Sequence, residues 1–279
     1  MDIDIAADRV DDRAAALAER HLALDLEHVR DVDADGVACR LYRPYAGAPV
    51  ALYVHGGGWV FHDLETHDRF CRHLADATGW ALLAVDYRRA PEHPYPAPLD
   101  DVETALRWLR GHAGDLGVDA TVVAGVGDSS GANLIAGLSV RDPRALDFQV
   151  LVYPPLDAQA ETESRRTEGT AQNGFEPAEM DWYWAAYAPT AQARHDPEVS
   201  PLRAADLSGQ PPTLVITAEH DLLRDEGEQY AAALRGAGVS CVAWRSLGTT
   251  HGFWRRPWEF AESVSAVRLV AATLAGLRP

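Results

Sequence analysis

The sequence predicts an α/β fold with a mostly parallel central sheet, helices on both faces of the sheet and a small helical cap. Continuous apolar runs alternate along the chain with stretches of helical character, and this alternation favours a parallel sheet covered on both sides. Side chains of catalytic types follow several of these runs, where parallel α/β folds place reactive groups. The predicted strands are 37–42, 49–54, 80–86, 121–126, 148–153, 212–217 and 240–247.

The composition indicates one globular domain over residues 1–279. A hydrophobic content of 47% in 279 residues suits a single α/β domain. The net charge of −17 opposes binding to nucleic acid or to an anionic membrane. No apolar run approaches the ~20 residues of a membrane helix. The acidic N-terminus lacks the pattern of a signal peptide, so a cytoplasmic location is expected.

Two residue types limit the chemistry. The chain contains no lysine, so all 25 basic residues are arginine, which excludes a Schiff-base lysine, a Walker lysine and a Ser–Lys dyad. Cys39, Cys71 and Cys241 are odd in number and widely spaced. This pattern is typical of buried free thiols and excludes a disulfide framework or a zinc site.

The first 35 residues are charged and include an amphipathic stretch from Ala14 to Val29. Leucines among Asp, Glu and Arg residues predict a helix here that lies on the body of the protein. Further helices are predicted at 68–78, 100–110, 132–140, 225–236 and 257–277.

Three consecutive glycines follow the strand 49–54, in the order His55-Gly-Gly-Gly-Trp59. Such glycines let the backbone approach another group with its N–H groups exposed. Beside a nucleophile these N–H groups can form an oxyanion hole, whereas the simpler alternative is a flexible turn. The flanking His and Trp favour the oxyanion hole, and we interpret His55 as a brace for the loop.

The segment Tyr87–Pro98 is rich in proline, with four prolines in its last eight residues. Proline at this density excludes a helix or a central strand and predicts a rigid loop. Glu92 and His93 lie in this loop. We interpret them as hydrogen-bonded scaffold and not as an acid–base pair.

The segment Gly127-Asp-Ser-Ser-Gly131 joins the strand 121–126 to a helical run of small residues. Strand, G-x-S-x-G and helix in this order are typical of a nucleophile elbow, which exposes its serine at the end of the sheet. A plain strand-to-helix turn could carry the same motif. Ser129 is therefore a candidate nucleophile whose partners must be found elsewhere in the chain.

Two further catalytic residue types follow predicted strands. Asp221 and Asp225 come after 212–217, and His251 follows the last strand. A histidine can take the serine proton and return it to the leaving group, while a carboxylate orients the imidazole. Asp221 lies nearer the strand and is preferred, whereas Asp225 is expected to cap the next helix.

Residues 156–199 interrupt the alternation of strands and helices and contain the cluster Trp182-Tyr-Trp184 with Tyr187. An insertion of this kind suits a cap over an active site. The rings either face the substrate or attach the cap to the body, and the sequence leaves both alternatives open. The substrate-pocket candidates are Trp59, Trp182, Trp184 and Phe253.

The chain resembles the hormone-sensitive-lipase-like esterases, bacterial family IV of the α/β-hydrolase superfamily. The matching segments are His55–Trp59, Tyr87–Pro94, Gly127–Gly131, Ser200–Leu202, Asp221–Asp225 and His251–Phe253. This resemblance implies an α/β-hydrolase fold in which Ser129 is the nucleophile, His251 the base and Asp221 its orienting acid.

The resemblance also implies an oxyanion hole made by the backbone N–H groups of Gly57, Gly58 and Ser130, and a cap that combines about 1–35 with part of 156–199. Family members usually carry alanine where this chain has Ser130. The donor there is a backbone N–H, so we expect the substitution to be tolerated.

Together these features predict a serine hydrolase that cleaves small or short-acyl carboxylic esters through an acyl-enzyme, without a metal or organic cofactor. An amidase or deacylase of a specialised metabolite would use the same machinery. A ligand-binding protein without turnover is a third alternative, which the presence of all three triad residues opposes. The expected partner is a small-molecule ester, and the family suggests a homodimer through the last strand and final helix.

Overall fold

The structure, a computed structural model, describes residues 4–277. Its strands are β1 (His28–Ala34), β2 (Val37–Arg43), β3 (Ala48–Val54), β4 (Ala81–Val85), β5 (Val118–Asp128), β6 (Phe148–Val152), β7 (Thr213–His220) and β8 (Cys241–Thr250). They form one sheet in the order β1-β2-β4-β3-β5-β6-β7-β8. β2 runs antiparallel to β1 and β4, and the other neighbours are parallel. The predicted mostly parallel α/β sheet is confirmed.

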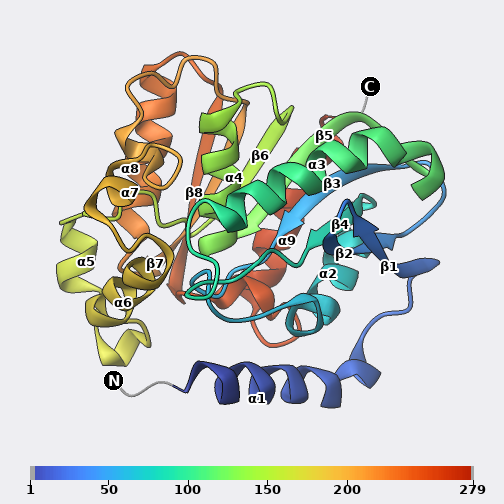
Figure 1. Cartoon of the computed structure of the whole chain (residues 1–279), viewed down its shortest axis with the longest axis horizontal. Helices are drawn as coiled ribbons and strands as arrows, with labels where there is room; N and C mark the ends of the chain where they lie inside the picture. Colours follow the sequence, from blue (N-terminus) through green and yellow to red (C-terminus); the bar gives the residue numbers. More distant parts are fainter. Residues whose placement is uncertain (1–3, 278–279) are drawn as a thin grey trace.

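Helices cover both faces of this sheet (Figure 1). They are α1 (Ile5–Ala18), α2 (Leu64–Thr78), α3 (Ala97–Leu116), α4 (Ser130–Arg141), α5 (Glu163–Thr167), α6 (Pro177–Tyr187), α7 (Ala191–His195), α8 (Arg224–Gly236) and α9 (Ala261–Ala275). Buried residues of α2 and α9 share one apolar core, and those of α3, α4 and α8 share another. The central strands are buried on both sides, which is why they read as continuous apolar runs.

The helix predicted between Ala14 and Val29 lies elsewhere in the structure, at Ile5–Ala18. The helix α1 ends at Ala18, a short 3₁₀ segment η1 (Arg20–Leu22) follows, and Val29 belongs to β1, where it pairs with Tyr42 of β2. The strand forms because β2 offers a long antiparallel partner, a contact that no local pattern encodes. Residues 1–3 of the predicted cap segment lie outside the described residues.

The helix α1 has no buried residue and is attached mainly by arginines. Arg9 donates hydrogen bonds to the carbonyl oxygens of Val60 and Ala90 at 2.8 and 2.7 Å, and it also binds the Glu92 carboxylate. Arg13 pairs with Asp63 at 3.1 Å. These contacts hold the helix along one side of the molecule (Figure 1).

The proline-rich loop ends earlier than predicted, because α3 begins at Ala97 and includes Pro98. Proline is tolerated in the first turn of a helix, where its missing N–H has no partner to lose. Tyr95 of the loop donates to the carboxylates of Asp196 and Glu198 at 3.0 and 2.9 Å, which fastens the loop to the segment 156–199.

Segment 156–199 forms the short helices α5, α6 and α7 with a 3₁₀ turn, η2 (Ala171–Asn173). Two more 3₁₀ turns, η3 (Pro201–Arg203) and η4 (Phe253–Arg255), precede β7 and α9. Among residues 4–277 no helix has the length and apolar character needed to cross a membrane.

Candidate active site

The serine elbow lies where β5 meets α4. Ser129 has φ 51° and ψ −123°, a conformation that side chains rarely adopt. A Cβ on Gly127 would lie 2.6 Å from the backbone of Gly131, and a Cβ on Gly131 would lie 2.0 Å from the carbonyl oxygen of Val54. Both glycines are therefore required for the turn that exposes Ser129 at the end of the sheet.

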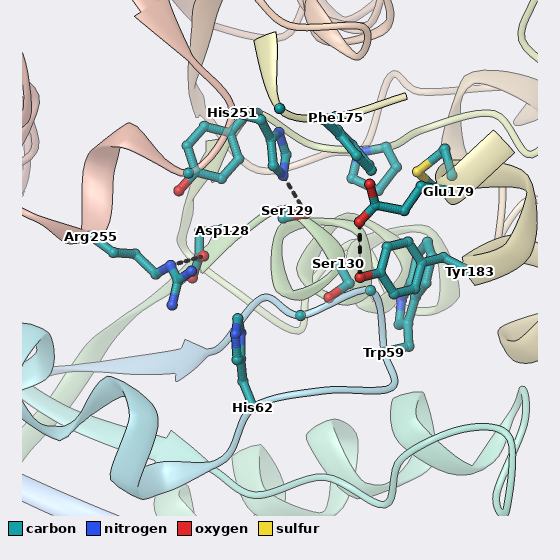
Figure 2. A pocket seen from close by; sticks show the side chains of 17 residues that line it. Trp59, His62, Asp128, Ser129, Ser130, Phe175, Glu179, Tyr183, His251 and Arg255 are labelled. Carbon is teal, nitrogen blue, oxygen red and sulfur yellow. Dashed lines mark hydrogen bonds and ion pairs between the residues drawn. The ribbon is translucent and has the colours of Figure 1, made fainter. Parts of the chain in front are cut away.

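Three polar side chains from separate strand ends form a hydrogen-bond chain. The Nδ1 atom of His251 lies 2.7 Å from Oδ2 of Asp221, and Nε2 lies 3.0 Å from Oγ of Ser129. The carboxylate can only accept, so Nδ1 carries the proton and Nε2 accepts from the Ser129 hydroxyl. Figure 2 shows His251 directed at Ser129. The structure thus brings together the three residues that the sequence singled out.

Asp221 is buried and is fixed a second time by the backbone N–H of Leu223, which donates to Oδ1 at 2.9 Å. The competing carboxylate, Asp225, lies in the first turn of α8 and accepts the N–H of Ser164 at 2.8 Å. It does not cap the helix as expected, because the N-cap position belongs to Leu223. Asp225 instead ties α5 to α8, away from His251.

The glycine loop after β3 presents backbone N–H groups beside Ser129. Gly57 and Gly58 have φ values of 123° and 60°, and among the described residues neither N–H donates a hydrogen bond. Ser130 opens α4, so its N–H has no acceptor within the helix. All three residues line the same cavity as Ser129, an arrangement that suits an oxyanion hole.

Asp128 connects this loop to the elbow, a role that the sequence reasoning missed. Its Oδ1 accepts the Gly56 N–H at 3.2 Å and the Tyr53 hydroxyl at 2.8 Å, and its Oδ2 lies 3.7 Å from Nε of Arg255. Burial alone would raise the pKa of Asp128, but nearby His67, Arg255 and Tyr53 together lower it. The carboxylate therefore stays charged and keeps accepting from the loop.

His55 is buried behind the loop and does not act as the general base for Ser129, whose hydroxyl is bonded to His251. Its Nδ1 contacts the Gly56 carbonyl oxygen at 2.8 Å, and its ring stacks on Tyr87 with centroids 4.4 Å apart. Burial lowers the pKa of His55 to about 3, so the ring is neutral at neutral pH. These contacts fit the brace expected from the sequence.

A cavity of about 150 Å³ opens over Ser129. Its apolar and aromatic wall comes in part from segment 156–199, as Figure 2 shows for Phe175 and Tyr183, and in part from Trp59, Tyr153 and Pro155. The lining residues are Gly57, Gly58, Trp59, His62, Asp128, Ser129, Ser130, Tyr153, Pro155, Gly174, Phe175, Glu179, Met180, Tyr183, His251, Gly252 and Arg255.

Of the four pocket candidates, Trp59 lines this cavity, whereas Trp182, Trp184 and Phe253 do not. Trp184 is buried behind Trp59, with ring centroids 4.5 Å apart. Trp182 stacks on Phe61 at 6.1 Å. These contacts favour, for both tryptophans, the alternative in which the rings attach the segment to the body.

Phe253 packs against Tyr153 with ring centroids 6.0 Å apart. The aromatic residues that reach the cavity from segment 156–199 are Phe175 and Tyr183, and Met180 and Glu179 accompany them. On α6, Glu179 and Tyr183 are four residues apart, the spacing of one helix face. That spacing was the available signal, but nothing local shows which face meets the cavity.

Comparison with known proteins assigns the family. Residues 51–255 match the family described by the alpha/beta hydrolase fold. The chain belongs to this family. A carboxylic ester hydrolase, LipN, of Mycobacterium tuberculosis is 40% identical over 272 residues, which are 91% of this chain and 71% of LipN.

Other relatives agree. An ethyl acetate hydrolase of Pseudomonas putida is 38% identical over 234 residues, 80% of this chain and 73% of that protein. The crystal structure of EstE1, a thermophilic carboxylesterase from a metagenomic library, has a TM-score of 0.93 at 35% identity and covers 99% of both chains. An esterase of Pyrobaculum calidifontis has a TM-score of 0.92 at 36% identity, over 99% of this chain and 94% of that one.

These relatives confirm three predictions: the α/β-hydrolase fold, membership of the hormone-sensitive-lipase-like esterases and an enzyme of the carboxylesterase type. The matched region 51–255 includes the glycine loop, the elbow and the strand ends that carry Asp221 and His251.

Proposed function

We propose that this α/β hydrolase cleaves small or short-acyl carboxylic esters with Ser129 as nucleophile, His251 as general base and Asp221 as its orienting acid. The observation that carries the proposal is the hydrogen-bond chain of 2.7 and 3.0 Å from Asp221 through His251 to Ser129. Such a chain lets a hydroxyl with a high pKa act as a nucleophile at neutral pH.

In the first half-reaction, Ser129 Oγ attacks the ester carbonyl carbon while Nε2 of His251 takes the hydroxyl proton. The carbonyl oxygen becomes an oxyanion, which the N–H groups of Gly57, Gly58 and Ser130 stabilise. His251 then gives its proton to the leaving alkoxide. An alcohol departs, and the acyl group remains bound to Ser129 as an ester.

In the second half-reaction, water enters and His251 takes one of its protons. The resulting hydroxide attacks the acyl carbon, the same N–H groups hold the new oxyanion, and Ser129 leaves with the proton from His251. A carboxylic acid is released. Asp221 stays ionised throughout and stabilises the imidazolium that forms twice in each cycle.

The short-acyl preference is supported by the small cavity, of about 150 Å³, and by the relative named as an ethyl acetate hydrolase. We propose that α1 and segment 156–199 together form the cap over this cavity. Support comes from Phe175 and Tyr183, which line the cavity from that segment, and from Asp12, whose carboxylate lies 3.8 Å from the lining residue His62.

The test is hydrolysis of p-nitrophenyl acetate, butyrate, octanoate and laurate by the wild type and by Ser129→Ala. We expect turnover that falls with chain length and a loss of about 10⁴-fold or more in the variant, with an acyl adduct on Ser129 seen by intact-mass spectrometry. Full activity of Ser129→Ala would contradict the assignment of the nucleophile. Turnover that rises toward laurate would contradict the short-acyl preference.

The amidase alternative uses the same residues and differs in the leaving group. Acetanilides matched to the aryl acetates distinguish the two, because amide hydrolysis needs a protonated amine to leave. The homodimer also stays a prediction. β8 is an edge strand with Val242 and Leu247 exposed on it, and sedimentation equilibrium would measure the assembly.

A further inference from the structure

Glu179 is a carboxylate in the wall of the catalytic cavity that lacks a positive partner. It comes from α6, and its Oε1 accepts the Tyr183 hydroxyl at 3.3 Å. Among residues 4–277 no arginine or histidine lies within ion-pair distance of it. Figure 2 shows Glu179 and Arg255 on opposite sides of Ser129.

The other charged groups of the cavity are matched. Arg255 lies 3.7 Å from the buried Asp128 carboxylate, and Asp221, which is hydrogen-bonded to His251, does not line the cavity. His62 also lines the cavity, but burial holds its pKa well below the ordinary value, so it adds no positive charge at neutral pH. Among the described lining residues, Glu179 is therefore the carboxyl group without a cationic partner, and burial raises its pKa while Tyr183 and His251 lower it.

A hollow beside the cavity is acidic as well. Asp8, Asp11 and Asp12 of α1 line a neighbouring hollow that shares Gly57, His62 and Tyr183 with the catalytic cavity. Carboxylates beside a cleft raise the local concentration of cations and lower that of anions. A substrate that approaches along this hollow meets negative charge before it reaches Ser129.

Aromatic rings accompany Glu179 in the cavity wall. Phe175 and Tyr183 lie with ring centroids 6.5 Å apart, and the Phe175 ring lies 4.7 Å from that of His251. Trp59 lines the same cavity. Aromatic faces attract ammonium groups, and several rings with a carboxylate form the kind of site that binds quaternary ammonium ions.

We propose that this esterase prefers small esters that carry an ammonium group, held by Glu179 and by the rings of Phe175 and Tyr183. The inference rests on the proposed function, because the ammonium site has meaning only beside a reacting ester. Glu179 and Ser129 share one small cavity, so the positive charge must lie a few bonds from the ester carbonyl.

The test uses pairs of esters that differ only in charge. Acetylcholine is compared with 3,3-dimethylbutyl acetate, in which carbon replaces the ammonium nitrogen on the alcohol side. p-Nitrophenyl 4-(trimethylammonio)butyrate is compared with p-nitrophenyl 5,5-dimethylhexanoate, which makes the same replacement on the acyl side. For each pair, the measured quantity is the ratio of kcat/KM for the charged ester to kcat/KM for the neutral ester.

We expect the wild type to favour the charged ester in at least one pair. Glu179→Gln keeps the size and the hydrogen-bonding oxygen of the side chain, and we expect it to lower that ratio on the order of tenfold. Because both esters meet the same variant, any loss of activity common to them cancels. Glu176→Gln is the matched control, since Glu176 is an exposed carboxylate at the start of the same helix and does not line the cavity.

A wild-type ratio at or below one in both pairs would overturn the inference. So would a ratio that Glu179→Gln and Glu176→Gln lower equally, because the effect would then come from overall charge. Turnover of p-nitrophenyl butyrate by the wild type, and its loss in Ser129→Ala, is measured in parallel. If the wild type does not hydrolyse p-nitrophenyl butyrate, or if Ser129→Ala hydrolyses it as well as the wild type does, the proposed function itself is overturned. An active esterase that does not favour the charged esters would overturn only the inference about the ammonium group.

Discussion

Two regions of this molecule meet at the catalytic cavity, and they are built differently. The floor consists of the strand-end segments 55–59, 128–131, 221–223 and 251–252. The roof consists of segment 156–199, to which the cap proposed above adds α1. Floor residues such as Asp128 and Asp221 are buried and hydrogen-bonded to neighbouring backbone. In the roof, α1 has no buried residue, and its attachment depends on Arg9 and Arg13.

We infer from this difference that the floor determines the rate of the reaction and the roof determines which esters are preferred. The floor segments directly follow strands of a sheet whose central strands are buried on both faces, and such anchoring suits the fixed geometry that catalysis needs. The roof contributes Phe175, Glu179 and Tyr183 to the cavity without belonging to the sheet. Changes in the floor should therefore alter the rate for all esters, and changes in the roof should alter the ranking of esters.

The largest effect is expected where Asp221 of the floor is compared with Asp225, the α8 carboxylate that binds segment 156–199 through Ser164. Asp221→Asn should lower kcat by about 10³- to 10⁴-fold, because an amide cannot hold the imidazole tautomer or stabilise the imidazolium. Asp225→Asn should change kcat little, because an asparagine oxygen can still accept the N–H of Ser164. Steady-state kinetics on p-nitrophenyl butyrate measures both. A larger loss for Asp225→Asn would reverse the assignment.

A smaller effect is expected where floor and roof touch. A Cβ at Gly58 would lie 2.1 Å from the Tyr183 ring, in a backbone conformation with φ of +60°. Gly58→Ala should therefore displace the loop or the ring and lower kcat/KM by about 10- to 100-fold, the scale of a misplaced oxyanion donor.

A double variant separates the two causes of this loss, which are the clash with Tyr183 and the strain of a positive φ at position 58. In a Tyr183→Ala background the clash is absent, so Gly58→Ala should cost less than it does in the wild type. Gly111→Ala is the control, because a Cβ there meets nothing within 4 Å. An equal loss with and without Tyr183 would assign the effect to backbone strain alone.

The smallest effect should be a change in substrate ranking. Phe175→Ala enlarges the cavity and should improve p-nitrophenyl octanoate relative to acetate by about threefold, less than the roughly tenfold or more that one methylene is worth in a closely fitting pocket. Trp182→Ala removes a ring that stacks on Phe61 outside the cavity. It should lower Tm and leave the ranking unchanged, as measured by kinetics and thermal unfolding. A change in ranking for Trp182→Ala alone would return that tryptophan to the substrate pocket.

The sequence was sufficient to single out Ser129, Asp221 and His251 because strand ends are local features, whereas the contacts of Asp128 with Gly56 and Tyr53 are tertiary and were missed. Ser129, Asp221 and His251 each follow an apolar run, and parallel strands bring their carboxyl ends to one edge of the sheet. Their meeting therefore needs no knowledge of long-range packing beyond the sheet itself.

The roof was harder to predict because its contacts are tertiary. Successive residues of a helix point about 100° apart, so Trp182, Tyr183 and Trp184 face three directions and the sequence does not state which one meets the cavity. The prediction of a helix from Ala14 to Val29 was wrong for a similar reason. Val29 pairs with Tyr42 across two strands, and the local pattern around it resembles a helix.

The Asp128 side chain has a consequence for how the molecule moves. One oxygen of this side chain receives the Gly56 N–H from the loop after β3, while the next residue along its own backbone is Ser129. The nucleophile and the loop that faces it are thus linked across two adjacent strands by a single short crosspiece. We therefore expect a displacement of either strand end to move Ser129 and the glycine loop together, which would preserve the space between them for the ester carbonyl.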